Sequence, residues 1–582
     1  MENPPQDKLV SLNRGTGFQP VRTRPRWPCH AFTAAHKMKH RIVTFQLEGR
    51  PFDKASLDHA RDKQGTPFDK AQGTQVSIHA GANLVEAAGL AGIVLNTVCG
   101  QKGTCQKCTV NLLPQNKPVL ACQYHISEDL TVLVPSDSRF VEHKILTEGI
   151  RRRDSVSPDI FTKYLSAAGN RPILGLAVDI GTTTVVLKLI EMKTGDVLAT
   201  SATLNPQTKF GDDVISRIGY AQTEEKLTEL NKLIIDCIND LIADCCTQTA
   251  AQTNDIYEAC IVGNTTMHHI FLRLPITQLG VAPYKAFSTD SKDSRPQEAG
   301  LNINPVGNVH TLANIAGFVG ADTTAVALAA ALDSADEMTL AIDIGTNGEI
   351  VLGTKDKLYA ASCAAGPAFE GARITCGSRA VQGAIEAVVL ADNDIDLDVA
   401  GGGRPVSICG SGLIDAVAVL LDLGVIDSSG RFTKSPGCKS RITEIDGRPA
   451  FILAYNNNKP SVYLTQKDIR EVQLAKAAIR AGIGLLQKRL SVTDTDIKHI
   501  FLAGAFGNYI RRESALRIGL LPDIPIERIQ SIGNAASSGA QMALVSSRWR
   551  KLAADLAGKI QYIEIAHDPL FQSAFADSML FG

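Results

Sequence analysis

A chain of 582 residues is too long for one hydrophobic core, so several domains are expected. Hydrophobic residues make up 44% and charged residues 20%, as in ordinary globular proteins, and the formal net charge of −1 argues against a nucleic-acid-binding surface. No apolar run is long enough for a membrane span, and the N-terminal arginines lack the apolar core of a secretory signal. Thirteen cysteines without such a signal favour the cytoplasm, where cysteines serve as buried small residues or metal ligands.

The N-terminal part of the chain predicts a small β-rich domain. Residues 1–37 contain Pro, Arg and Gly without periodicity, and we expect a disordered extension there. The domain itself is expected at 38–135, and residues 50–73, which carry the segment PFDKA twice, are expected to be an insert at a hairpin tip. The predicted elements are, in chain order, strands at 41–47 and 75–79, a helix at 83–88, and strands at 109–113 and 130–134.

Behind a polar linker at 136–172, the pattern changes to alternating strands and helices and then repeats. Two apolar runs around a Gly/Thr turn predict a hairpin at 173–190, and the same arrangement returns at 339–352. In each half, the hairpin is followed by a segment whose apolar residues have helical spacing and then by a buried strand. The sequence therefore predicts a duplicated, multidomain α/β body, with one subdomain at 173–335 and a second at 336–582.

Four cysteines of the N-terminal domain have ligand spacing, three on one short loop and the fourth further along the chain. They are Cys99, Cys105, Cys108 and Cys122. A [2Fe–2S] cluster takes four thiolates from the protein, and Gly100 and Gly103 would let the loop turn its N–H groups toward the sulfurs. Structural zinc remains the alternative, although zinc sites usually pair two C-x2-C knuckles and only one such spacing occurs here.

An Asp-x-Gly-Thr turn joins the two strands of each predicted hairpin. Glycine in such a turn lets the backbone approach a polyphosphate, and Thr hydroxyls and backbone N–H groups donate to its oxygens. Asp179 and Asp343, each at a strand end, are the candidates for holding Mg²⁺ directly or through water. The candidate phosphate-binding residues are Gly181, Thr182, Thr183 and Thr184 in the first turn and Gly345, Thr346 and Asn347 in the second.

A loop after the late strand of each half completes the candidate nucleotide site. In the second half, small residues that include Gly504 and Gly507 leave room for an adenosine moiety against the backbone. By the duplication, the corresponding loop of the first half would serve the phosphates or the catalytic side. Its candidate residues are Gly263, Asn264 and Thr265.

A long helix precedes the adenosine-side loop. It begins at Thr465 with a sequence typical of a capping box, in which Asp468 returns the cap. The same helix carries Lys476 and Arg480, two cations that could lie at the edge of a bound nucleotide. We expect a solvated face for these two cations rather than a ligand contact.

The motifs resemble two known classes of protein. The cysteine spacing over residues 40–135 resembles that of plant-type and adrenodoxin-like ferredoxins, which implies a β-grasp fold and a one-electron carrier. The glycine-rich elements resemble the phosphate-1, phosphate-2 and adenosine motifs of the acetate and sugar kinase/Hsc70/actin (ASKHA) superfamily, with ribonuclease H-like halves. Fused in one chain, the two resemble the reductive activators of corrinoid proteins over 40–135 and 173–582. Further stretches in that family's style lie at 205–207, 211–217, 314–322, 366–371 and 533–536.

The resemblance implies an ATP-dependent reductase that uses a [2Fe–2S] cluster, ATP and Mg²⁺. Its substrate would be a corrinoid (cobalamin-binding) protein whose cobalt has slipped to Co(II) and which one electron returns to Co(I). The step is uphill from a plant-type cluster near roughly −400 mV, so ATP is expected to drive it. The resemblance also implies an upstream low-potential electron donor and suggests a homodimer, although the sequence leaves the oligomeric state open. Charge and hydropathy predict neither nucleic acid nor a membrane as partner.

Three other functions remain open. A small-molecule kinase of the ASKHA superfamily with an appended redox-sensing ferredoxin domain would use the same nucleotide motifs. An activator of a radical dehydratase would share the fold, but such activators hold a cluster between two subunits, and four cysteines in one chain remove that need. A non-enzymatic electron carrier would leave both phosphate turns unexplained. The sequence names neither the corrinoid protein nor the electron donor.

Overall fold

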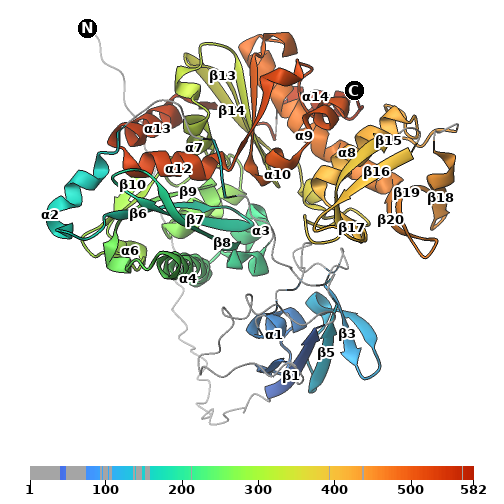
Figure 1. Cartoon of the computed structure of the whole chain (residues 1–582), viewed down its shortest axis with the longest axis horizontal. Helices are drawn as coiled ribbons and strands as arrows, with labels where there is room; N and C mark the ends of the chain where they lie inside the picture. Colours follow the sequence, from blue (N-terminus) through green and yellow to red (C-terminus); the bar gives the residue numbers. More distant parts are fainter. Residues whose placement is uncertain are drawn as a thin grey trace, which may run out of the picture.

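The computed structural model describes residues 40–47, 74–91, 93, 95, 103, 108–135, 138, 147–150, 157–211, 213–391, 394–434, 438–566 and 568–582. The predicted extension at 1–37 and the predicted insert at 50–73 lie outside the described residues, as do Cys99 and Cys105. No helix within the described ranges is long and apolar enough to cross a membrane. Figure 1 shows the chain coloured from blue to red along the sequence.

The N-terminal unit is a five-stranded sheet in the order β2-β1-β5-β3-β4, in blue in Figure 1. β1 pairs antiparallel with β2 and parallel with β5, and β3 pairs antiparallel with β4 and β5. Side chains alternate along β3 between buried and partly exposed, because one face of the sheet packs on α1. The predicted strands and helix are confirmed, and β4 is an addition. The elements are β1 (His40–Leu47), β2 (Thr74–His79), α1 (Leu84–Leu90), β3 (Thr109–Leu113), β4 (Lys117–Leu120) and β5 (Leu130–Val134).

The first half of the body is a six-stranded sheet in the order β10-β11-β9-β6-β7-β8. β6, β7 and β8 form an antiparallel meander, and β9 and β11 run parallel to β6. The central strands are buried along most of their length because helices cover both faces. The strands are β6 (Leu174–Ile180), β7 (Thr184–Glu191), β8 (Val197–Leu204), β9 (Ile256–Gly263), β10 (Lys292–Ser294) and β11 (Asn308–Thr311). The helices are α2 (Leu165–Ala168), α3 (Val214–Tyr220), α4 (Glu224–Thr249), α5 (Thr265–Phe271), α6 (Pro296–Ala299) and α7 (Ala321–Ala329).

The second half repeats this design. Its sheet has the order β22-β21-β12-β13-β14-β23, with the same antiparallel meander followed by parallel strands. β12, β13, β14, β21 and β22 therefore correspond to β6, β7, β8, β9 and β11. The predicted hairpin at each Gly/Thr turn and the predicted duplication of the sheet are confirmed. The strands are β12 (Thr339–Ile344), β13 (Gly348–Thr354), β14 (Lys357–Cys363), β21 (His499–Ala503), β22 (Ile529–Gly533) and β23 (Gln561–Tyr562).

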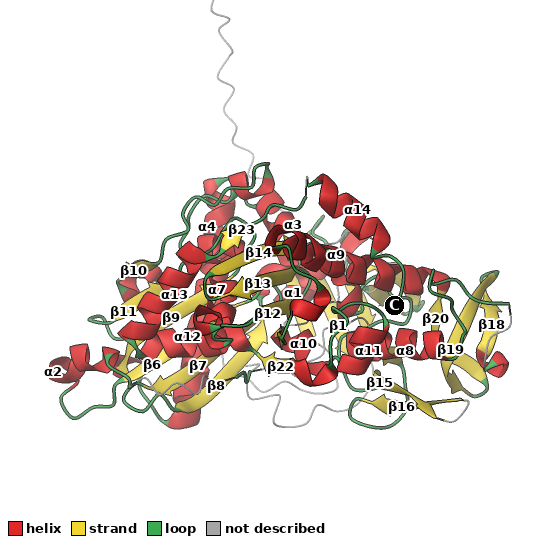
Figure 2. Cartoon of the chain, turned by 90° about the horizontal axis from the view of Figure 1, so that it is seen from above, coloured by secondary structure: helices red, strands yellow, loops and turns green. Residues whose placement is uncertain are grey.

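Two small sheets are inserted into the second half, and the sequence did not predict them. They lie at the end of the molecule farthest from β6–β8 in both views (Figures 1 and 2). Helix α8 packs on β15, and α9 returns the chain to the main sheet. The inserted elements and the returning helix are β15 (Ala384–Ala391), β16 (Asp394–Val399), β17 (Ser407–Ile408), α8 (Gly410–Asp422), β18 (Ile442–Ile445), β19 (Arg448–Asn456), β20 (Lys459–Thr465) and α9 (Gln466–Leu490).

Helix α9 confirms the predicted capping box, since Thr465 and Asp468 cap each other's backbone N–H groups. The expected solvated face for Lys476 is wrong. The Lys476 side chain is buried, donates to the Leu580 carbonyl and lies 5.5 Å from the centre of the Phe581 ring. The residues that bury Lys476 come from a segment about a hundred positions away, and helical spacing alone gives no sign of that contact.

The last helices of the chain return to the first half. α12 packs on β6, β9 and α7, and α13 packs on α7, so one apolar core contains residues of both halves. α7 and α12 cross at Gly539, where an added Cβ would overlap the backbone of Ala325. The close crossing joins the two halves directly. The remaining helices are α10 (Gly504–Tyr509), α11 (Arg512–Arg517), α12 (Ala535–Val545), α13 (Ser547–Lys559) and α14 (Pro569–Asp577).

Candidate functional site

The two Gly/Thr turns occupy equivalent positions in the two halves. One joins β6 to β7 and the other joins β12 to β13. The loops that were paired by the duplication also correspond, since Asn264 follows β9 as the cap of α5 and Gly504 follows β21 at the start of α10. In each half the turn and the loop lie at neighbouring strand ends, because β6 is parallel to β9 and β12 is parallel to β21.

The first turn is held by hydrogen bonds from buried polar side chains. The Asn264 amide donates to the Thr182 hydroxyl over 2.9 Å, and the Asn205 amide donates to the Gly181 carbonyl over 2.8 Å. The Arg217 guanidinium donates to the Thr182 carbonyl. The two bonds to backbone carbonyls fix the backbone of the turn, as a preformed phosphate-binding loop requires.

Arg217 is the largest fully buried side chain among the described residues. Besides Thr182, its guanidinium donates to the Gly211 carbonyl over 2.9 Å and to the Gln207 side chain over 3.2 Å. A buried guanidinium is tolerated only when its donors are satisfied, so the surrounding carbonyls set its position. Arg217 thereby ties the segment after β8 to the first turn.

The second turn has a different support. The Thr346 hydroxyl donates to Glu370, whose other carboxylate oxygen lies 3.7 Å from the Arg379 guanidinium. Gly504 has φ +81°, and a Cβ at this position would overlap the Asp343 carboxylate. Only glycine therefore fits where the adenosine-side loop passes Asp343.

Four carboxylates, two from each half, face one another where the halves meet: Asp179, Asp322, Asp343 and Glu349. We call them the carboxylate cluster. Burial, together with the nearby Asp322, raises the pKa of Asp179 and of Asp343 to about 7. Burial raises the pKa of Asp322 itself to about 6 and that of Glu349 well above its usual value. Each side chain keeps partial solvent contact. Such concentrated negative charge is typical of a cation-binding site.

Two polar side chains, Asn534 and Lys188, interact with Asp179 of the carboxylate cluster. The Asn534 amide donates to Asp179 over 3.1 Å, and the Lys188 ammonium faces the same carboxylate; both lower the pKa of Asp179 and oppose the effect of burial. Lys188 is itself buried. Asp179 is thus oriented by residues of both halves.

The described residues contain no group of three or more His, Cys, Asp or Glu side chains close enough to hold a metal ion by themselves. In proteins Mg²⁺ usually takes one or two carboxylates together with water and the phosphates of a nucleotide. The donor set of the turns, with hydroxyls and backbone N–H groups beside the carboxylate cluster, fits a magnesium–polyphosphate ligand.

The metal-free protein should lose stability as pH rises through the range in which the carboxylate cluster ionises. The folded-state pKa values of about 6 to 7 exceed the unfolded value near ~3.9, so the stabilising contribution is complete below that value and is lost as pH rises through the folded pKa. Asp322→Asn should therefore raise the free energy of unfolding at pH 8 by on the order of 2 kcal/mol and leave it unchanged near pH 4. Urea titrations of both proteins at the two pH values test this. An equal difference at both pH values would contradict it.

Two of the four cysteines predicted to bind the iron–sulfur cluster lie within the described residues. Cys108 and Cys122 are both buried in the core of the N-terminal unit. The pairing of β3 with β4 places Cys108 beside Ala121, whose amide donates to the Cys108 carbonyl over 3.0 Å. Gly103 has φ +72°, which confirms the predicted turn at that residue. Cys99 and Cys105 are outside the described residues, so the ligand set stays a prediction.

Several predicted nucleotide residues have structural partners in place. The Thr265 hydroxyl is buried and donates to the Ala316 carbonyl over 2.6 Å. The Gly507 carbonyl accepts a hydrogen bond from the Ser531 hydroxyl over 3.2 Å. Thr265 and Gly507 thus hold neighbouring loops, whereas the first turn and Asn264 lie together as predicted.

Sequence reasoning assigned no role to four residues that the structure brings to the site: Arg217, Asp322, Glu349 and Asn534. Arg217, Asp322 and Asn534 fall within the stretches 211–217, 314–322 and 533–536, which resemble the corrinoid-activator family. Glu349 is the second residue of β13, the strand that follows the second turn. These stretches were therefore recognisable, but the role of each residue depends on contacts between segments that are far apart in the sequence.

Comparisons with known proteins agree with this architecture. The family model for the C-terminal domain of RACo, described as its ASKHA domain, matches residues 337–582, and the model for the RACo middle region matches 174–335. The corrinoid activation enzyme RamQ of Eubacterium limosum is 36% identical over 563 residues, covering 84% of this chain and 95% of that protein.

Two further proteins are similar over most of their length. A solved structure described as a reductive activator for a corrinoid, iron–sulfur protein has a TM-score of 0.65 and 32% identity, covering 93% of this chain and 98% of its own. A reductase for the Co(II) methylated amine-specific corrinoid protein of Methanosarcina barkeri is 26% identical over 405 residues, covering 64% of this chain and 70% of that protein.

The duplicated sheets and paired turns define an ATPase body of the ASKHA class. The chain belongs to the RACo family, the reductive activators of corrinoid proteins. The predicted family is confirmed.

Proposed function

We propose that this chain reductively activates a corrinoid protein by returning its cobalt from Co(II) to Co(I) at the expense of ATP. The observation that carries the proposal is the pair of equivalent turns whose Asp179 and Asp343 both belong to the carboxylate cluster. The same chain bears Cys108 and Cys122 in its N-terminal unit, which we call the cysteine module. Family membership supplies the substrate class, since the relatives are described as corrinoid activators.

The nucleotide is proposed to bind between the two halves. The first turn, which Asn264 and Arg217 hold, would bind phosphate oxygens through Gly181 and Thr182–Thr184. The second turn would contribute Gly345, Thr346 and Asn347. Asp179 and Asp343 would hold Mg²⁺, and ionisation of the carboxylate cluster would be offset by the metal. Gly504 would admit the adenosine side.

The N-terminal unit is proposed to be a β-grasp domain that holds a [2Fe–2S] cluster through Cys99, Cys105, Cys108 and Cys122. The strand order with a parallel β1/β5 pair and a helix on one face supports this proposal. The Gln123 amide lies 3.7 Å from the Cys122 sulfur, and such donors favour a bound thiolate. When bound, the cluster supplies one-electron chemistry.

ATP is proposed to act by a difference in affinity between two arrangements of the halves. The carboxylate cluster draws residues from both halves, and α7 and α12 cross at their junction, so a ligand at this position favours one arrangement over another. Nucleotide binding can thus change the affinity for the corrinoid protein without contacting it.

The decisive experiment mixes the reduced full-length protein with Mg-ATP and a Co(II) corrinoid protein encoded near its gene, and follows the visible spectrum. Formation of Co(I) that requires ATP supports the proposal. Failure to form Co(I) with any such protein would count against it, and transfer of phosphate to a small molecule under the same conditions would favour the kinase alternative.

A further inference from the structure

The linker between the cysteine module and the body contacts the candidate nucleotide site. Residues 147–150 run beside the end of β22. The Ile150 amide donates to the Ile532 carbonyl over 2.9 Å, and the Asn534 amide donates to the Glu148 carbonyl over 2.8 Å. The linker is therefore hydrogen-bonded through its backbone at the residue whose side chain contacts Asp179.

This linker contact depends on two glycines that face each other. Gly149 and Gly533 form an antiparallel bridge. A Cβ on Gly149 would overlap the Asn534 carbonyl, and a Cβ on Gly533, which has φ +66°, would overlap the Glu148 carbonyl. Where two facing positions accept only glycine, the two backbones lie too close together for any side chain. The close contact between the linker and β22 therefore depends on both glycines.

Asn534 connects the linker to the carboxylate cluster and to α12. Its backbone amide is bound by the linker, its side-chain amide donates to Asp179 over 3.1 Å, and its side-chain oxygen accepts from the Ser537 amide as the cap of α12. A shift of the linker backbone by a fraction of a hydrogen-bond length would thus move the group that orients Asp179.

A second path joins the linker to the same carboxylate. The Glu148 carboxylate lies 3.9 Å from the Lys188 ammonium, and Lys188, whose side chain is 1% exposed, faces Asp179. Glu148 and Asp179 therefore share one buried cation. A metal ion bound at Asp179 would repel the Lys188 ammonium, so its binding can shift Lys188 relative to Glu148.

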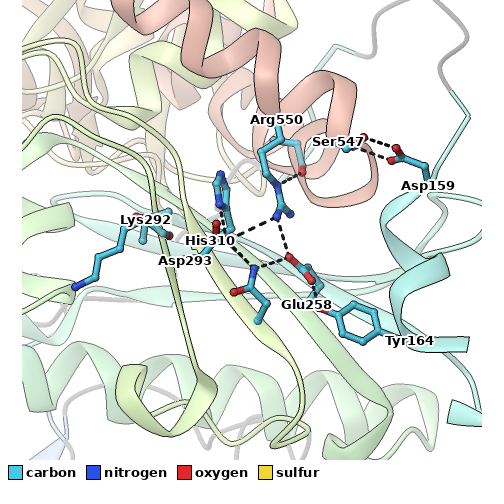
Figure 3. A network of polar contacts seen from close by, with 11 residues as sticks. Asp159, Tyr164, Glu258, Lys292, Asp293, His310, Ser547 and Arg550 are labelled. Atoms are coloured by element: carbon cyan, nitrogen blue, oxygen red, sulfur yellow. Dashed lines mark hydrogen bonds and ion pairs between the residues drawn. The ribbon is translucent and has the colours of Figure 1, made fainter. Parts of the chain in front are cut away.

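The linker is also attached at the other end of α12. The Asp159 amide donates to the Val545 carbonyl over 3.1 Å, and the Asp159 carboxylate accepts from the Ser547 amide over 2.7 Å and from the Ser547 hydroxyl (Figure 3). Asp159 lies just before the short helix Ile160–Tyr164. Both ends of α12 are thus bonded to the linker.

A buried ionic network reinforces the second attachment. The Tyr164 hydroxyl donates to Glu258, which is fully buried on β9, and the Arg550 guanidinium of α13 donates to the same carboxylate over 2.9 Å (Figure 3). Tyr164 thus joins the linker to β9 and α13. Removing one partner from such a network is costly, so this end of the linker is fixed.

We infer that linker residues 147–150 are a positioning element of the nucleotide site, so that occupancy at Asp179 is coupled to the backbone of the linker. The inference rests on the proposed function only in that nucleotide binds at the carboxylate cluster. Glu148 and Gly149 act through Asn534 and Lys188, and neither needs to touch the nucleotide.

Amide hydrogen exchange of the unmodified full-length protein tests the coupling directly. Adding Mg²⁺ and a non-hydrolysable ATP analogue should slow exchange of the first turn at 181–183 and also of the amides of Ile150 and Asn534. Slower exchange at the turn with no change at Ile150 and Asn534 would overturn the inference and leave the proposed function intact. No change at either place would instead remove the nucleotide site itself.

Gly149→Val in the full-length protein tests the same contact by function, with Gly558→Ala as the matched control, since a Cβ on Gly558 meets nothing within 4 Å. We expect Gly149→Val to raise the KM for Mg-ATP about tenfold and to lower the Co(I) formed per ATP hydrolysed, with the cluster spectrum unchanged. A KM and a ratio equal to those of the control would overturn the inference. The exchange experiment needs no variant and decides the matter if Gly149→Val does not fold.

Discussion

Replacing Asp343 by Asn should lower ATP-dependent formation of Co(I) by about 100-fold or more, while the absorption of the iron–sulfur cluster stays unchanged. Asp343 ends β12 beside the second turn, its pKa is raised to about 7 by burial and by Asp322 and Asp179, and Gly504 passes directly over it. An amide is nearly the same size but carries no charge for Mg²⁺, so the loss falls on the metal-bound nucleotide.

The control for this prediction is Asp356→Asn, because Asp356 is exposed in the turn between β13 and β14 of the same sheet. Its variant should activate the corrinoid protein as the unchanged chain does. The Asp343→Asn protein should also be no less stable without Mg²⁺, since it removes a buried charge. Full activation by Asp343→Asn would place the nucleotide elsewhere.

Replacing Cys122 by Ser should abolish the visible absorption of the cluster and with it the formation of Co(I), while Mg-ATP still binds. Cys122 is 5% exposed in the core of the N-terminal unit, apart from the carboxylate cluster in sequence and fold. A hydroxyl is a poor ligand for iron compared with a thiolate, so cluster loading fails while the body remains folded.

Absorption spectra and calorimetric titration with Mg-ATP measure the two effects separately. Cys438→Ser is the matched control, because Cys438 lies in the second half and is only partly buried. It should retain both the cluster and nucleotide binding. A Cys122→Ser protein with an undiminished cluster spectrum would exclude Cys122 as a ligand, and loss of ATP binding would show that the two modules do not fold independently.

The features that sequence predicted well are local ones. The hairpins around both Gly/Thr turns, the long helix with its Thr465 cap and the positive φ of Gly103 each depend on a few neighbouring residues. The duplication followed from two such hairpins, because equal local patterns fold into equal sheets. The family followed from the combination of cysteine spacing and paired turns.

Long-range contacts account for what sequence did not predict. Asp322 acquires its role because the start of α7 brings it near Asp179 and Asp343, and Asn534 because α12 returns to the first half. Lys476 is buried by residues near the end of the chain. The two inserted sheets interrupt the repeat, and no local pattern indicates where a repeat is interrupted. The identity of the cysteines that bind the iron–sulfur cluster and of the residues that bind the nucleotide stays a prediction.

The crossing of α7 and α12 lies near the middle of α12. At ~1.5 Å per residue, Gly539 lies about 8 Å from Asn534 and about 9 Å from Val545. The contact of Asn534 with Asp179 and the contact of Val545 with Asp159 are thus at nearly equal distances from the crossing, on opposite sides of it. Any residue larger than glycine at 539 would separate the two helices and disturb both contacts, although it touches neither the nucleotide residues nor the cysteines.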